Sequence, residues 1–386
     1  MNRIYMDHNA TTPVHPDVLA AMWPLYTEEW GNPSSIHWAG RGPAGQIDDA
    51  RDAVAALINA PARDLVFTSG GTEADNTALM GVLLARRDRG RHIVTSAIEH
   101  KAIIDMAKSL SVLHDGEITF LPVDSRGRHD LDAFAASLRD DTVLASVMLA
   151  NNELGNLNPI KEMAAIAHER GVLFHCDAVN ALGKVPIDVK DLGVDLMSIS
   201  AHKIYGPKGC GALYVKRKTP FEPYIRGGGH ERGRRCGTYN AAGIAGFGKA
   251  SELAQAALDA GAAERLASLR DRLQARILDA VDGVEINGDV DDRLPNTTNL
   301  SFEGVDGEAL VLNLDLRGIA ISTGSACTSG SLDPSHVLVA LGKDPKWLDA
   351  AIRFSLGSAN DEAQVDAVAT AVIEEVHKLR RLAATG

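Results

Sequence analysis

The sequence has few cysteines, no long apolar run and no excess of positive charge. Its 386 residues include four cysteines without a CxxC pair or zinc-type spacing, so we expect neither a disulfide framework nor a metal site. No apolar run approaches the length of a membrane span. The first residues reach Asp7 before an apolar stretch forms, so we expect no signal peptide and a place in the reducing cytoplasm.

The balance of charges further narrows the possible classes of protein. Lys and Arg number 39 against 51 Asp and Glu, which gives a net charge of −12. Binding to nucleic acid or to a membrane surface requires a basic face. We therefore expect neither partner, and we interpret the basic clusters at 216–218 and 232–235 as solvated loops.

Apolar strands alternate with helical segments through the first half of the chain. Strand-length apolar runs occur at 64–69, 92–96, 142–150, 171–180 and 194–200. The run at 142–150 is apolar throughout, which is typical of a strand covered on both faces in a parallel sheet. The alternation predicts a doubly wound α/β architecture, with a mostly parallel sheet covered by helices.

The length of the chain suits about two domains. We predict a large domain at 14–255 and a smaller α+β domain formed by residues 1–13 and 256–386. The last helix carries valines on one face, which is typical of packing on a core: Val365, Val368, Val372 and Val376.

A lysine and an acid follow two of the predicted strands. Lys203 comes just after the strand that ends at Ser200 and before a Gly-Pro-Lys-Gly turn, and Asp177 ends the strand before it. Parallel strands deliver their carboxyl ends to one edge, so the two side chains are expected to face one pocket. Such a pair suits pyridoxal phosphate, whose ring nitrogen a carboxylate keeps protonated and which a lysine amine holds covalently. A single lysine in such a turn is more often simply solvated.

A glycine turn at 70–76 joins a strand to a helix. Amide N–H groups and the helix dipole make this arrangement an anion site. The turn lacks GxGxxG and GxxxxGK spacing, so it does not favour a nucleotide, and an ordinary strand-to-helix turn is the alternative.

His100 follows the strand at 92–96, where a histidine is more often a surface or helix-capping residue. Its ordinary pKa near neutrality would suit acid–base work.

Cys327 lies between Gly and Ser residues in the segment 322–331, which predicts an exposed loop. Its thiol is either incidental or a functional nucleophile.

Three motifs together, at 200–209, 228–238 and 324–331, resemble those of the cysteine desulfurases. These are pyridoxal-phosphate enzymes with the class V aminotransferase fold, also called fold type I. The loop around Cys327 is similar to that of the long-loop branch, which includes the housekeeping and nitrogenase-associated enzymes. The resemblance covers nearly the whole chain.

The resemblance implies a role for each matching residue. Arg353 would clamp the substrate carboxylate, and Cys327 would receive the sulfur. His100 would stack on the cofactor ring and take part in proton transfer. Thr238 would reach the cofactor phosphate of the partner subunit, which implies a homodimer. The implied cofactor site consists of Gly71, Thr72, His100, Asn151, Asp177, Asn180, Ser200, His202, Lys203 and Thr238.

Two positions depart from the family pattern. Asn180 stands where the family has a Gln that binds the phenolic oxygen of the cofactor, and its side chain is one methylene shorter. The contact is therefore lost, mediated by water, or recovered by a shift of the backbone. Cys236 stands where Ser or Ala is commoner, and the sequence offers no functional reason for it.

The implied reaction converts L-cysteine to L-alanine and leaves a persulfide on Cys327. The sulfur would pass to an iron–sulfur scaffold or another acceptor protein. Two alternatives stay open. An aminotransferase or a selenocysteine lyase would use the same cofactor without a cysteine relay. A sulfur-relay or cluster-assembly scaffold would keep the fold without catalysis, with Asn180 as a mark of that loss.

Overall fold

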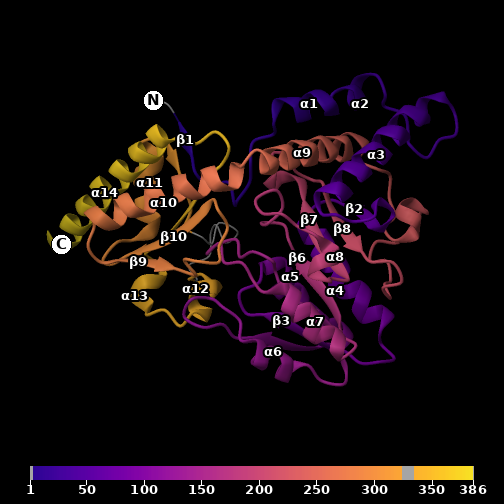
Figure 1. The fold of residues 1–386 in the computed structure, drawn as a ribbon, viewed down its shortest axis with the longest axis horizontal. Helices are drawn as coiled ribbons and strands as arrows, with labels where there is room; N and C mark the ends of the chain where they lie inside the picture. The colour runs from indigo at the N-terminus through magenta and orange to yellow at the C-terminus, as the bar shows by residue number, and fades with distance from the viewer. Residues whose placement is uncertain (1–2, 324–333, 386) are drawn as a thin grey trace.

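A seven-stranded sheet forms the centre of the larger part of the molecule (Figure 1). The computed structural model describes residues 3–323 and 334–385. Within the sheet only β8 runs against its neighbours, so the sheet is mostly parallel, as predicted. In spatial order the strands are β2 (Leu65–Thr68), β8 (Gly211–Val215), β7 (Leu196–Ser200), β6 (Leu173–Asp177), β5 (Thr142–Ser146), β3 (His92–Ser96) and β4 (Glu117–Leu121).

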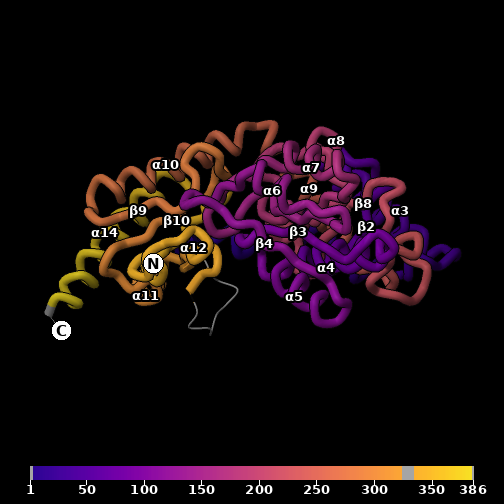
Figure 2. Tube along the Cα trace, turned by 90° about the horizontal axis from the view of Figure 1, so that it is seen from below, coloured from indigo at the N-terminus to yellow at the C-terminus, as the bar shows by residue number. Residues whose placement is uncertain are grey.

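Helices cover both faces of this sheet (Figure 2). One face packs against α4 (Gly71–Ala85) and α5 (Lys101–His114). The other packs against α3 (Trp38–Leu57), α6 (Leu131–Ser137), α7 (Ile160–Glu169) and α9 (Ala241–Asp259). Every residue of β5 is buried, which confirms the prediction of a strand covered on both faces. The strand ends at Ser146, and the rest of the apolar run 147–150 is buried loop that leads to the sheet edge.

The C-terminal part of the chain builds a second core of its own. Its sheet is antiparallel, in the order β12 (Ala351–Ser355), β10 (Thr297–Phe302) and β9 (Val284–Asn287). The packing helices are α10 (Ala262–Ala280), α11 (Gly307–Leu316) and α14 (Glu362–Thr385), with short α12 (His336–Ala340) and α13 (Pro345–Leu348) nearby. The valines predicted to pack on a core are all fully buried here: Val365, Val368, Val372 and Val376.

Two connections join the cores. Helices α9 and α10 run on from one core to the other, with a break at Gly261, whose φ of 79° favours glycine (Figure 1). The chain also begins in the C-terminal core, where Met6 is buried and β1 (Ile4–Tyr5) pairs with β11 (Ile319–Ala320). Residues 7–12, which we call the N-terminal strap, then cross to α1 (Pro16–Met22) and α2 (Pro24–Thr27). The domain boundaries given above stay a prediction.

The contact between α3 and α9 depends on a missing side chain. A Cβ atom on Gly248 would lie 2.6 Å from both Cα and Cβ of Ala50, whereas one on the exposed Gly45 of α3 would meet nothing within 4 Å. We expect Gly248→Ala to destabilise the fold by about 1–3 kcal/mol through overpacking. Gly45→Ala should stabilise it by about 0.5–1 kcal/mol, because alanine favours the helix. Urea unfolding of both variants checks this, and shifts of the same sign would contradict it.

Candidate active site

The carboxyl ends of the parallel strands carry most of the residues predicted to form a site. Asp177 ends β6, and Lys203 lies in a single 3-10 turn, η2 (Ala201–Lys203), directly after β7. These strands are parallel neighbours, with Asp177 beside Ser198 in register. His100 and Asn151 follow β3 and β5 at the same edge. The sequence-based expectation that these residues share one sheet edge is therefore met.

Asp177 is buried, and its environment sets its ionisation. Its Oδ1 accepts a hydrogen bond of 2.8 Å from the Val179 amide. Burial raises the pKa of the carboxyl to about 6, while the Val179 amide and the charge of Lys203 lower it. Asp177 is therefore ionised at neutral pH, as a partner for a protonated ring nitrogen must be.

A buried polar network underlies Asp177. The ring of His175 bridges Ser146 Oγ at 2.8 Å and Ser198 Oγ at 2.9 Å, which links β5, β6 and β7. Burial lowers the pKa of His175 to about 3, so the ring is neutral. Asp75 of α4 lies 3.8 Å from the same ring, and burial raises the pKa of its carboxyl well above the ordinary value. The network links the strand ends beneath Asp177, and burial disfavours the charged forms of both His175 and Asp75.

His100 caps the start of α5. Its Nδ1 accepts a hydrogen bond of 3.1 Å from the Ala102 amide. Burial, and then the charges of Lys203 and His336, lower the pKa of the ring to about 4. The ring is thus neutral at neutral pH, with its proton on Nε2. It presents a hydrogen-bond donor to the site, rather than a group that titrates near neutrality.

The turn predicted to bind an anion corresponds to the start of α4. Gly70 has a φ of 154°, and no side chain caps the helix there. A Cβ atom on Gly71 would lie 2.7 Å from Val179 Cγ2, so the helix start and the loop after Asp177 approach too closely for any other residue. The exposed Thr72 follows in the first turn. Free amides, the helix dipole and a nearby hydroxyl suit a phosphate group.

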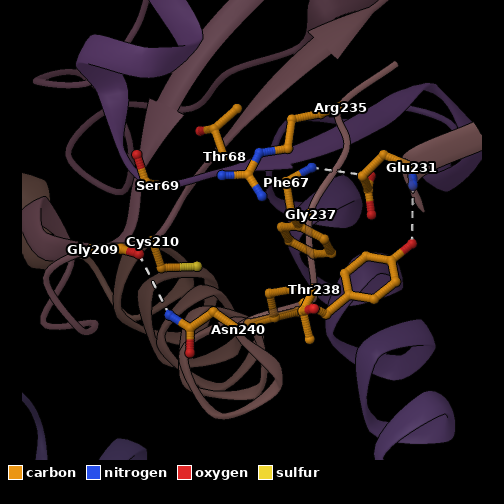
Figure 3. Close-up of a pocket in the computed structure, with 12 residues that line it drawn as sticks. Phe67, Thr68, Ser69, Gly209, Cys210, Glu231, Arg235, Gly237, Thr238 and Asn240 are labelled. Atoms are coloured by element: carbon orange, nitrogen blue, oxygen red, sulfur yellow. Dashed lines mark hydrogen bonds between the residues drawn. The ribbon is translucent and has the colours of Figure 1, made fainter. Parts of the chain in front are cut away.

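A cavity of about 120 Å³ lies beside this anion site (Figure 3). Thr68, Ser69 and the exposed Thr238 are among its lining residues. Glu231 fixes the segment that carries Thr238, because it accepts from the Phe67 amide at 3.1 Å and forms a buried ion pair with Arg51. Whether Thr238 also serves a partner subunit stays a prediction.

The N-terminal strap brings in residues that the sequence analysis did not identify as functional. Asp7 Oδ1 lies 2.7 Å from Nη2 of Arg353, which is almost fully buried at the centre of β12. Nη1 of Arg353 donates to the Asn152 carbonyl at 3.0 Å. The Lys203 amine donates to the Asn9 carbonyl, and to the Ala10 carbonyl at 3.0 Å. The strap therefore contacts both cations predicted to act on the cofactor and the substrate.

Other predicted site residues are placed as follows. Thr11 Oγ1 of the strap lies 3.1 Å from His202 Nδ1, and Ser200 Oγ donates to the Cys210 carbonyl at 3.4 Å. The Asn151 side chain is fully buried and shapes its own loop, because its oxygen accepts from the amides of residues 153 and 154. Among the described residues nothing forms a hydrogen bond with the buried side-chain oxygen of Asn180. That oxygen is available to a bound group.

Cys327 lies outside the described residues, but both described flanks of its segment are anchored at the site. The backbones of Ser322 and Arg353 exchange hydrogen bonds of 3.3 and 2.7 Å. On the other side, Ser335 Oγ donates to Glu153 at 2.6 Å, and His336 Nε2 lies 2.9 Å from the Glu99 carbonyl, next to His100.

The donor set fits pyridoxal phosphate. A lysine amine, an ionised carboxylate, an uncapped helix start and an open amide oxygen meet at one sheet edge.

The described ranges contain no group of three or more His, Cys, Asp or Glu side chains arranged to hold a metal ion. Nor does any helix in them combine the length and the apolar composition of a membrane crossing. Cys236 is buried, and nothing in the structure explains its presence.

Comparison with known proteins places the chain among similar sequences and folds. The family model for aminotransferase class V matches residues 4–368. A cysteine desulfurase of Nostoc sp. is 47% identical over 99% of this chain and 95% of that protein. A solved structure of a NifS-like protein superposes with a TM-score of 0.91 at 37% identity, over 97% of this chain and all of the other. A structure of SspA in complex with cysteine gives 0.81 at 32% identity, over 92% and 99% of the two chains.

The buried histidines make the stability of the fold sensitive to acid. Burial lowers the pKa of five rings to about 3 or 4, those of His8, His100, His129, His175 and His202. Between these values and the ordinary 6.5 the unfolded chain binds more protons, so the free energy of unfolding falls as the pH drops through that window.

We expect His129→Gln, remote from the strap, to reduce the proton uptake on unfolding by about one in that window. Its ring is bound to Ser96 Oγ at 3.1 Å, and the glutamine amide can replace this contact. Urea unfolding of the protein and the variant at a series of acidic pH values measures the slope. A variant with the slope of the unsubstituted protein would contradict the assignment.

Proposed function

Because the chain belongs to the class-V aminotransferase family and, within it, to the cysteine desulfurases, we propose that it converts L-cysteine to L-alanine and carries the released sulfur as a persulfide on Cys327. The observation that carries the proposal is the pairing of Lys203 with the buried Asp177 at the carboxyl edge of the sheet. When bound, pyridoxal phosphate supplies the electron sink that lets the substrate C–S bond break.

We assign the cofactor site to residues at the sheet edge. Lys203 would hold the cofactor covalently, and its amine would move a proton during the reaction. Asp177 faces the ring nitrogen, and the helix start at Gly71 and Thr72 binds the phosphate. His100 stacks on the ring and donates from Nε2. Asn180 would reach the phenolic oxygen through a bridging water, and Thr238 would complete the phosphate site across a homodimer.

The substrate site follows from Arg353. Its guanidinium already binds Asp7 and the Asn152 carbonyl, which fix its plane. A fixed, planar donor suits the carboxylate of L-cysteine. Ser322, at the described start of the segment that carries Cys327, exchanges backbone hydrogen bonds with Arg353, which supports a position of that segment near the substrate.

The sulfur step balances without an outside oxidant. The Cys327 thiolate attacks the substrate sulfur, an S–S bond forms and the substrate C–S bond breaks. The electron pair of the broken bond stays with the substrate carbon, which takes up a proton and becomes the methyl group of alanine. The sulfur is oxidised and the carbon is reduced by the same two electrons. The persulfide then passes to an iron–sulfur scaffold or another acceptor protein, and we propose the cytoplasm as the compartment.

The test compares Lys203→Ala and Cys327→Ser with the unsubstituted protein. We expect the protein to release sulfide and alanine from L-cysteine in equal amounts when a reductant is present, and we expect both variants to be inactive. Only Lys203→Ala should lose the visible absorbance of covalently bound cofactor. Cys236→Ser is the control, because its buried thiol has no part in the proposed reaction.

Other outcomes would point to the alternatives. Activity that is indifferent to Cys327 would replace the persulfide mechanism with that of an aminotransferase or a selenocysteine lyase. A colourless protein that releases neither product would support a non-catalytic scaffold.

We expect Arg353→Lys to raise KM for L-cysteine by about 10- to 100-fold with a smaller change in kcat, because an ammonium group cannot hold the substrate carboxylate in two places. Steady-state kinetics of alanine formation measures the effect. Arg270→Lys is the matched control, since Arg270 is also buried and donates to a backbone carbonyl, that of Leu294, at 2.8 Å. An unchanged KM in Arg353→Lys would place the substrate carboxylate elsewhere.

A further inference from the structure

Lys184 is a buried lysine that the proposed reaction does not use. It follows the loop after Asp177, and only 8% of it is exposed. Its amine donates to the side-chain oxygen of Asn9 at 2.9 Å. The charged groups that act on it most strongly, Lys203 and Arg353, are both cations, and with burial they lower its pKa well below the ordinary value. Burying an amine among cations costs free energy, so this position needs a reason other than stability.

Asn9 links this lysine to the proposed catalytic lysine. Its side-chain oxygen accepts from Lys184, and its backbone carbonyl accepts from the Lys203 amine. The same side-chain oxygen also accepts from Asn296 at 3.2 Å, while the side-chain nitrogen of Asn9 donates to Thr297 Oγ1 at 2.9 Å. Asn9 is thus held from both sides, and Lys184 supplies the shortest bond to its oxygen.

Backbone hydrogen bonds anchor the strap at His8, whose amide donates to the Ser355 carbonyl at 3.1 Å, and at Thr12, whose amide donates to the His202 carbonyl at 3.0 Å. Between these anchors, the side-chain contacts of Asn9 help to determine where the carbonyls of the strap point. Those carbonyls, of Asn9 and Ala10, are the acceptors for the Lys203 amine.

We propose that Lys184 is a positioning residue for Lys203: by fixing Asn9, it aims the carbonyls that hold the Lys203 amine toward the cofactor site. The inference rests on the function proposed above for Lys203. Without the Lys184 amine, the side-chain oxygen of Asn9 keeps its longer bond to Asn296 while the side-chain nitrogen still donates to Thr297, and we expect Asn9 to hold the Lys203 amine less firmly.

The test measures how fast Lys203 reacts in protein freed of cofactor. Pyridoxal, which lacks the phosphate, is the probe, and borohydride reduction followed by mass spectrometry locates and counts the attachment at Lys203. We expect Lys184→Met and Asn9→Ala each to slow the attachment by about tenfold, because a misdirected amine reacts poorly. If Lys184 acts through Asn9, the double variant is no slower than Asn9→Ala alone.

Lys190→Met is the matched control. Its amine makes the same kind of bond, to the side-chain oxygen of Asn59 at 3.0 Å, but at the surface. We expect an unchanged rate for this variant, and a melting temperature for Lys184→Met that is no lower than that of the unsubstituted protein. Should Lys184→Met fail to fold, Lys184→Gln, which keeps a donor, takes its place with a smaller loss of rate.

Two results would overturn the proposal. One is Lys184→Met reacting at the unsubstituted rate. The other is a double variant slowed by the product of the two single effects, which would mean that Lys184 does not act through Asn9. Failure of the proposed function has a different signature, because pyridoxal would then attach to other lysines and Lys203 would carry none, with or without the substitution.

Discussion

The site depends on a crossing of six residues between two hydrophobic cores. The N-terminal strap leaves the C-terminal core at Met6, binds Arg353 through Asp7, and offers its carbonyls to Lys203. A single short piece of chain thereby binds both cations that we propose to act on the substrate. Hydrogen bonds to the strap then set the relative position of Arg353 and Lys203. Packing between the two cores alone would control this position less tightly.

Burial decides the charge state of the site, and it does so selectively. The rings of His100 and His175 are neutral because the cost of burying a charged ring dominates their pKa values. Burial also raises the pKa of Asp177, but the Val179 amide and the charge of Lys203 lower it. This carboxyl therefore still ionises below neutral pH. The fold therefore compensates the burial of the carboxyl that, in the proposed reaction, must be charged to hold a protonated ring.

The parts of the site that lie at the ends of strands could be predicted from the sequence. The strand at 92–96 is β3 as predicted, and the residues after β6 and β7 could be paired because parallel strands share an edge. The strap could not be found in this way. Asp7 meets Arg353 across 346 positions and Asn9 meets Lys184 across 175, and no periodicity carries contacts at such separations. The signal available in the sequence was a polar segment, Asp7 to Asn9, that follows the short strand β1.

The structure also limits how Asn180 could contact the phenolic oxygen of the cofactor. A shift of the backbone could let Asn180 reach as far as the family Gln does. Contacts on both sides of the loop after Asp177 oppose such a shift. Asp177 holds the Val179 amide at 2.8 Å, and Val179 packs against Gly71 where no Cβ fits. Moving the loop would break the first contact or displace the start of α4, to which we assign the cofactor phosphate. The buried oxygen of Asn180 costs about 1–3 kcal/mol if it has no partner. A bound group or a bridging water must therefore complete it, so the shorter side chain favours a water between Asn180 and the phenolic oxygen.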